Sequence, residues 1–226
     1  MRVDRFSTGR VRPKRESRGV HRYLGGGWSD ETLPVNAFLV HHPDGLCLFD
    51  TGQTARAARP GYHQRWHPFL RLARFELGPE DEIGPQLVRV GIDPAAVRWV
   101  VLSHLHTDHV GGVGSFPGAK VIVSRVEWER AQGLAGQLRG YVPQHWPLGK
   151  PTLVDGSYDV AGDGSLLVVP APGHTPGHLA MIVRDEAGGW FLGGDVAHTP
   201  SELPRDLAAM CEREGLTALL AHDGDV

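Results

Sequence analysis

The stretch SHLHTDHVGG, at residues 103–112, decides the fold of this chain. Residues 97–102 read VRWVVL, an apolar run typical of a buried strand, so the polar side chains begin where that strand ends. In extended chain, residues two apart point to the same side, so His104 and His106 can face one ion together. This spacing predicts a metal site at the end of the strand.

The residues that follow extend the site. Asp108 and His109 come as the chain turns, and their side chains diverge toward a second position nearby. Gly111 and Gly112 allow the backbone to pass tightly behind them. Unpartnered histidines and a carboxylate would cost free energy if buried here by accident, so the cluster favours metal binding.

Three later segments place further ligand types after apolar runs. They are PAPGHTPGH (170–178) with His174, FLGGDVAH (191–198) with Asp195, and ALLAHDGD (218–225) with His222. Binding groups collect at strand ends in α/β sheets, so we expect these side chains to join those of residues 104–109.

Composition excludes several classes of partner. With 226 residues, one domain covering 1–226 is expected, and the net charge of −3 favours neither nucleic acid nor an anionic membrane. No apolar stretch is long enough for a membrane span or a signal core, which predicts a cytoplasmic protein. Two cysteines, Cys47 and Cys211, make no disulfide framework, whereas 13 histidines are a first indication of metal.

The coarse pattern predicts a layered α/β domain with helices outside two sheets. Hairpins are expected at 33–52, turning at Asp44–Gly45, and at 177–195, turning at 187–189. Further strands are expected at 97–104, 120–124 and 165–172, and helices at 79–90, from Ser124 onward, and at 201–215.

Two segments stand apart from this pattern. Basic residues crowd residues 1–20, which we interpret as a solvated arm rather than a binding patch. Residues 55–77 mix arginines with Trp66, Phe69 and Phe75, and fit either an amphipathic surface helix or a lid or dimer-contact segment beside a pocket. The protein is expected to be a monomer or a homodimer.

The motifs HLHTDH, GHTPGH, GGD and AHD resemble the ligand motifs of the metallo-β-lactamase superfamily, and LFDTG resembles its early strand-end motif. The similarity runs from residue 33 to residue 223. It implies a four-layer αββα sandwich with a two-metal site at one edge.

The resemblance also implies a role for each residue. The first metal would be held by His104, His106 and His174, and the second by Asp108, His109 and His222, with Asp195 bridging the two. Asp50 would orient a ligand by a hydrogen bond. His178 is expected to be structural, and His63 and His67 to be surface residues of the lid segment.

Imidazole and carboxylate ligands without thiolate suit two Zn²⁺ ions, and also Fe, Mn or Co. Two such ions can share a water and generate a bridging hydroxide that attacks an ester-type carbonyl. Asp108 is placed to hold the proton of that hydroxide and to deliver it to the leaving group. The expected enzyme is a metal-dependent hydrolase of a small molecule.

The chain is most similar to the N-acyl homoserine lactonase, or quorum-quenching, branch, in PVNAFLVHHPDGLCLFDTG and in the run from 80 to 112. Lactonases of this type usually have a tyrosine three residues after the bridging aspartate, where this chain has His198. That histidine is either a substitute hydrogen-bond donor to the substrate carbonyl or an exposed residue. The alternatives are a thioesterase or arylesterase, a β-lactamase, and a mono-iron persulfide dioxygenase.

Overall fold

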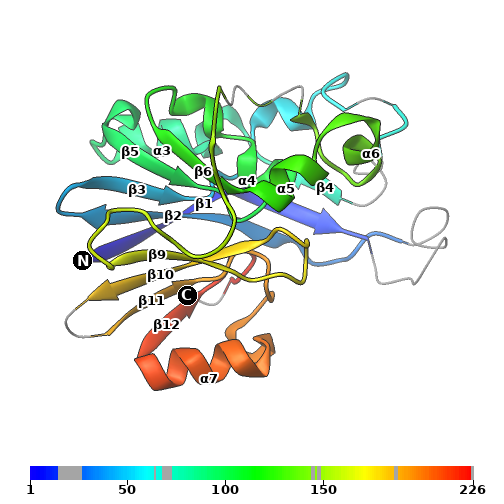
Figure 1. Ribbon diagram of the computed structural model, residues 1–226. Coiled ribbons are helices and arrows are strands. Elements are labelled where there is room, and N and C mark those ends of the chain that lie inside the picture. Colours follow the sequence, from blue (N-terminus) through cyan, green and yellow to red (C-terminus); the bar gives the residue numbers. More distant parts are fainter. Residues whose placement is uncertain are drawn as a thin grey trace.

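The structure is a computed structural model and describes residues 1–14, 27–63, 65–67, 73–143, 146, 149–185 and 188–224. Its strands form a seven-stranded sheet, ordered β4-β1-β2-β3-β5-β6-β7, and a five-stranded sheet, ordered β12-β11-β10-β9-β8 (Figure 1). The strands are β1 (Arg2–Pro13), β2 (Leu33–His42), β3 (Gly45–Phe49), β4 (Ala73–Glu76), β5 (Val97–Val101), β6 (Lys120–Ser124), β7 (Thr152–Val154), β8 (Tyr158–Asp159), β9 (Leu166–Pro170), β10 (Leu179–Asp185), β11 (Gly188–Leu192) and β12 (Leu216–Leu219).

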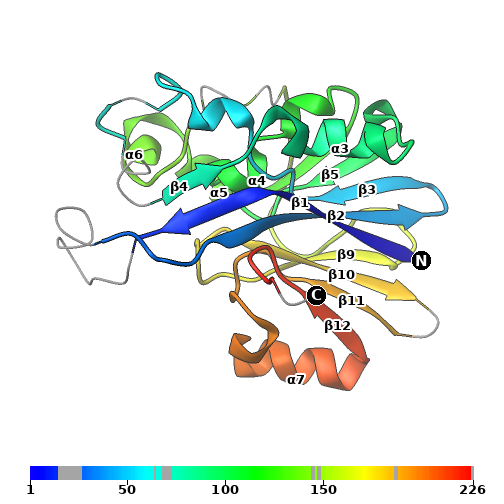
Figure 2. The same ribbon diagram turned by 180° about the vertical axis from the view of Figure 1, so that it is seen from behind.

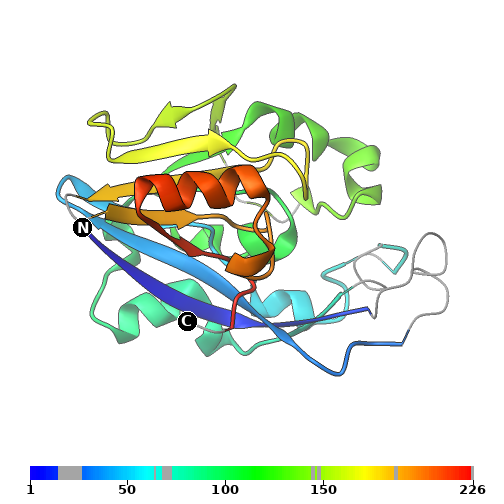
Figure 3. The ribbon, with the colours of Figure 1, turned by 90° about the horizontal axis from the view of Figure 1, so that it is seen from below.

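Helices cover the outer faces of both sheets, as Figures 1 and 2 show from opposite sides. Seen from below, α7 lies across the second sheet (Figure 3). The α-helices are α3 (Ile83–Arg89), α4 (Thr107–Val110), α5 (Arg125–Arg130), α6 (Gly133–Leu138) and α7 (Arg205–Glu214); the 3₁₀ turns are η1 (Ala55–Ala58), η2 (Pro79–Asp81), η3 (Pro94–Ala96), η4 (Val113–Ser115) and η6 (Pro200–Glu202). The expected four-layer αββα sandwich is confirmed.

The layers follow from side-chain alternation in the strands. In β2, Ala37 and Leu39 pack into the core under the outer helices, whereas Phe38 and Val40 pack into the core between the sheets. Successive strand residues point to opposite faces, so a strand apolar on both faces is buried between two layers. A third, smaller core lies between the second sheet and α7.

Both expected hairpins are present. The first turns at Pro43–Asp44, one residue earlier than expected, because Gly45, at φ 143°, already pairs with His42 of β2. In the second, Gly188 and Gly189 already pair with Asp185 and Arg184 of β10. The prediction of a turn at 187–189 is therefore wrong for both glycines, and residues 186–187 lie outside the described part.

The expected arm over residues 1–20 is wrong for most of its length. Residues 2–13 form β1, which pairs antiparallel with β2 and β4 and lies inside the seven-stranded sheet. Phe6 and Val11 are buried. Alternating apolar residues, diluted by arginines that face solvent, hid this strand; residues 15–20 lie outside the described part.

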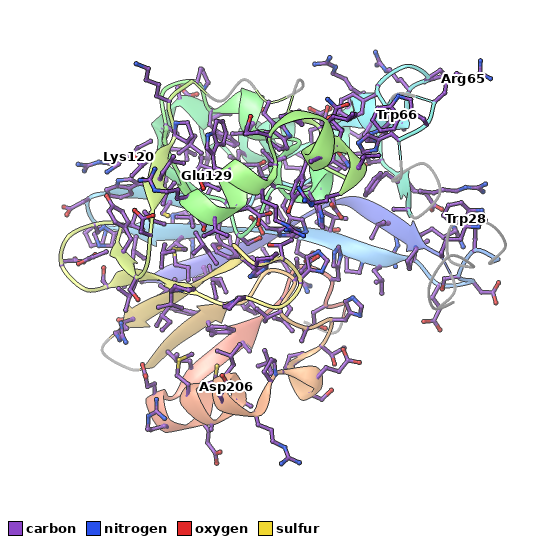
Figure 4. All side chains as sticks on the ribbon, turned by 45° about the vertical axis from the view of Figure 1, so that its right-hand side comes forward. Trp28, Arg65, Trp66, Lys120, Glu129 and Asp206 are labelled. Carbon is purple, nitrogen blue, oxygen red and sulfur yellow. The ribbon has the colours of Figure 1, made fainter. Side chains whose placement is uncertain are left out.

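The segment 55–77 is not one helix in its described parts. It begins with η1 and ends with β4, in which Phe75 pairs with Val11 of β1. Trp66 is 43% exposed, and Figure 4 shows it beside Arg65 on the outer surface. Phe69 lies outside the described residues, so the lid interpretation stays a prediction.

The expected helices are interrupted near prolines. Residues 79–90 divide into η2 and α3, and residues 201–215 into η6 and α7, which starts after Pro204. Gly215, in the left-handed conformation at φ 64°, ends α7. Within the described residues, no helix has the length and apolar content needed to cross a membrane.

Gly112 confirms the tight backbone passage expected behind the HLHTDH segment. A Cβ at this residue would lie 2.3 Å from the carbonyl oxygen of Thr51. The close approach brings the turn after β3 against the turn after α4, and the amide of Gly112 donates to the carbonyl of Gly52. Any larger side chain would have to displace backbone here.

Gly112→Ala should therefore lower the free energy of unfolding by about 2 kcal/mol or more. Gly118→Ala is the matched control, because a Cβ there meets nothing within 4 Å; it should change stability by less than about 1 kcal/mol. Urea unfolding of the two variants at equal metal content measures the difference, and equal losses would contradict the close-approach explanation.

Candidate metal centre

The side chains expected to form the site lie together, at the edge where strands of both sheets end. β5, β9, β11 and β12 each end a few residues before one of them. Three overlapping sets have their ring nitrogens and carboxylate oxygens within 4.8 Å of one another: His104, His106 and His174; His104, His109 and Asp195; and Asp108, His109 and His222.

The first set consists of three imidazoles whose nitrogens converge. Nδ1 of His106 lies 3.0 Å from Nε2 of His104 and 2.9 Å from Nε2 of His174. Burial lowers the pKa of His104 and of His106 well below the usual value, and it also lowers the pKa of His174. All three rings are therefore neutral near pH 7, the form in which imidazole binds metal.

Asp195 lies between the set of His104, His106 and His174 and the set of Asp108, His109 and His222. One carboxylate oxygen, Oδ1, is 3.2 Å from Nε2 of His109 and 3.4 Å from Nε2 of His222. The other, Oδ2, is 3.4 Å from Nε2 of His174 and 3.9 Å from Nε2 of His104. Each oxygen thus faces a different set, which is the arrangement of a bridging carboxylate.

The far nitrogens of three rings are held by hydrogen bonds. Nδ1 of His109 donates to Oδ2 of Asp50 at 2.8 Å, and Nδ1 of His222 donates to the carbonyl of Pro34 at 2.7 Å. The Ser103 hydroxyl donates to Asp50 at 2.8 Å, so it accepts from Nδ1 of His104 at 3.0 Å. In His104 this leaves Nε2 with its lone pair toward the site, and in His109 and His222 it turns Nε2 toward the carboxylate of Asp195.

Opposing effects act on the pKa values around Asp195. Burial alone would raise the pKa of Asp195, but His109 and His222 outweigh it and the pKa is well below its usual value. Burial alone would lower the pKa of His109, yet Asp195 and Asp50 raise it well above its usual value. Asp195 is consequently ionised and able to accept positive charge from more than one direction.

The donor set fits divalent metal ions. Nε2 of His109 and Oδ1 of Asp195 lie 3.2 Å apart, yet among the described residues both are buried and neither makes a hydrogen bond. Such groups normally find a partner, and here both point into a space lined by imidazole and carboxylate. Cys47 lies in the core between the sheets, where burial raises its pKa to about 12, so thiolate plays no part.

Other expected residues take different places. His178 accepts a hydrogen bond from the backbone amide of Asp195 at 3.1 Å, and burial lowers the pKa of this imidazole to about 3. His198 is exposed, and its ring centroid lies 6.1 Å from that of His222. His63 and His67, expected at the surface, are both buried, and Nε2 of His67 donates to the carbonyl of Tyr141.

Sequence reasoning missed the residues that support His106. Tyr141 stacks on its ring, with centroids 5.2 Å apart, and donates its hydroxyl to Glu127 at 2.8 Å. The same oxygen of Glu127 accepts from the amide of Leu105 at 3.2 Å. A glutamate in an otherwise ordinary helix carried no signal, because its burial depends on segments far apart in the chain.

Comparison with known proteins agrees with this geometry. Residues 30–226 match the metallo-beta-lactamase superfamily. The N-acyl homoserine lactonase AttM of Azorhizobium caulinodans is 35% identical over 88% of this chain and 86% of its own length. The lactonase of that name from Rhizobium radiobacter is 37% identical over 70% of this chain, and the match spans 63% of that relative.

A solved structure shares the fold. An N-acyl homoserine lactone hydrolase with N-hexanoyl-L-homoserine bound at its catalytic metal centre superposes with a TM-score of 0.75 at 23% identity, covering 99% of this chain and 93% of the other. The chain therefore belongs to the metallo-β-lactamase superfamily, as one of its metal-dependent hydrolases. The resemblance expected from the motifs is confirmed.

His222→Ala should reduce the metal content of the zinc-loaded protein from the expected two ions per chain to about one, because the set of Asp108, His109 and His222 loses an imidazole. His198→Ala is the control, since its ring neighbours His222 without belonging to any of the three sets. Inductively coupled plasma mass spectrometry after dialysis measures the zinc content of both variants. Two ions in the His222 variant would show that another group holds the second ion.

Proposed function

We propose that the protein is a dinuclear metal hydrolase that opens the lactone ring of N-acyl homoserine lactones. The observation that carries this is Asp195, whose two oxygens face two separate sets of neutral or carboxylate-paired ligands. An enzyme with a single ion, such as a mono-iron dioxygenase, would have no use for the additional set of Asp108, His109 and His222. The lactonase names of the relatives support the lactone over other esters.

In this proposal His104, His106 and His174 hold the first ion and Asp108, His109 and His222 the second. Zn²⁺ suits the nitrogen and oxygen donors best, and Fe, Mn or Co would also bind. When bound, the two ions would polarise the substrate carbonyl and lower the pKa of a water from about 16 toward 7.

Asp108 is the proposed proton carrier. It lies in the first turn of α4, and its Oδ2 is 3.9 Å from Nε2 of His222, on the side of the second set. It takes the proton that the attacking water loses and returns it to the ring oxygen as the C–O bond breaks. Water and lactone thus give one N-acyl homoserine: the new hydroxyl keeps the returned proton, and the new carboxyl group releases its own proton to solvent near pH 7.

His198 is the proposed donor to the substrate carbonyl oxygen. It follows Asp195 by three residues, its ring is exposed, and it approaches His222 edge to face. Its backbone amide donates to Glu202, which fixes the start of the turn that presents it. An imidazole N–H in this position can stabilise the negative charge that develops as the carbonyl is attacked.

The test is a hydrolysis panel on the zinc-loaded protein, containing a hexanoyl homoserine lactone, an aryl ester, a thioester and a β-lactam. We expect kcat/KM for the lactone to exceed kcat/KM for each of the other substrates by about 100-fold or more. The reason is that the groups of the site are placed to stabilise the transition state of one substrate class. Asp108→Asn should lower kcat on the lactone by about 10²–10⁴. A higher kcat/KM for the thioester or the β-lactam would replace the proposal.

His198→Phe should lower kcat on the same lactone by about 10²–10³ while KM and metal content stay near wild type. His198→Gln is the conservative control, because its side-chain amide keeps an N–H donor and should recover most of the rate. Equal kcat in the wild type and the phenylalanine variant would assign His198 to the surface alone.

A further inference from the structure

The segment that carries His222 leaves the second sheet and rests on the first. β3 pairs with β2 only from Phe38 to His42, so among the described residues β1 is the sole strand beside positions 34–36 of β2. Residues 220–223, which follow β12, lie beside these positions. The backbone amide of Asn36 donates to the carbonyl of Ala221 at 2.8 Å. Backbone groups of β2 that would otherwise lack partners are satisfied by the ligand-bearing loop.

The side chain of Asn36 strengthens the same contact. It is 2% exposed, and its Nδ2 donates to the carbonyl of Asp223 at 2.9 Å and to that of Leu220 at 3.4 Å. These carbonyls flank His222 on either side. An amide has two N–H donors, so both are used on the loop, and a buried amide without such partners would be costly.

The position of the loop decides where the His222 ring points. Nδ1 of His222 donates to the carbonyl of Pro34, two residues before Asn36, which leaves Nε2 toward Asp195 at 3.4 Å. A shift of residues 220–223 along β2 would break this bond and turn the ring. The amide of Ala221, which donates to Gly194 at 3.1 Å, holds the other side of the loop but not its register on β2.

We propose that Asn36 is a positioning residue for the second metal, acting through His222 by fixing residues 220–223 against β2. The inference rests on the proposed two-metal centre. The contacts of the buried side chain favour it, because both hydrogen bonds given by Nδ2 of Asn36 go to carbonyls of residues 220–223.

The experiment is zinc titration of the whole protein, which resolves two binding constants per chain. Asn36→Ala should weaken the second constant by about 10–100-fold and leave the first within about threefold, as expected for a residue that orients a ligand. Asn36→Asp has the same shape and maintains packing, but places a carboxylate against two carbonyls, so its second constant should be weaker still.

Thr8→Val is the matched control. The Thr8 hydroxyl is buried and donates to the carbonyl of Val35 at 2.9 Å, so its loss removes a side-chain hydrogen bond from the same strand without touching the loop. It should lower thermal stability but change neither zinc constant. If Thr8→Val weakened the second zinc constant as much as Asn36→Ala does, Asn36 would contribute only to stability and the proposal would be overturned.

A double-mutant cycle closes the test. If Asn36 acts through His222, then Asn36→Ala added to His222→Ala should change zinc binding no further. An additional loss at the remaining ion would overturn the proposal. A wild-type protein that binds only one zinc would instead contradict the two-metal centre itself, whereas normal zinc binding without lactone hydrolysis would contradict only the proposed substrate.

Discussion

The carboxylate of Asp50 is the constraint on which the rest of the centre depends. It accepts hydrogen bonds from the amide and hydroxyl of Ser103 and from the ring of His109, and thereby ties the end of β3 to the turn after β5 and to α4. Asp50 itself is in the left-handed region, at φ 60°, which a non-glycine residue adopts only where its surroundings enforce it. The strained backbone and the three hydrogen bonds together orient two imidazoles, that of His109 directly and that of His104 through Ser103.

The same logic applies around the site. Each ring is fixed from behind by a different element: His109 by the end of β3, His222 by the main chain of β2, and His106 by the stacked ring of Tyr141. None of these supports is itself a candidate ligand. The geometry of the centre is therefore set by packed strands and buried side chains.

Local pattern predicted the parts of the molecule whose signals are local. The strand before His104, the hairpin within residues 33–52 and the convergence of ligand types at strand ends all follow from short runs of residues. β1 was missed because its arginines masked the alternation, and His63 and His67 were placed at the surface because four-residue spacing says nothing about burial. Glu127 and Asn36 were beyond reach, since their partners are contributed by segments distant in the chain.

The division of the ligands between the sheets has a thermodynamic consequence. His104, His106 and His109 follow β5 of the first sheet, whereas His174, Asp195 and His222 follow strands of the second. An ion bound by both groups joins the two halves of the sandwich, and an ion that binds the folded chain alone adds about 2.7 kcal/mol of stability at a free concentration 100 times its Kd. Chelation would then loosen the interface between the two sheets first, so that resistance to proteolysis would report on metal occupancy.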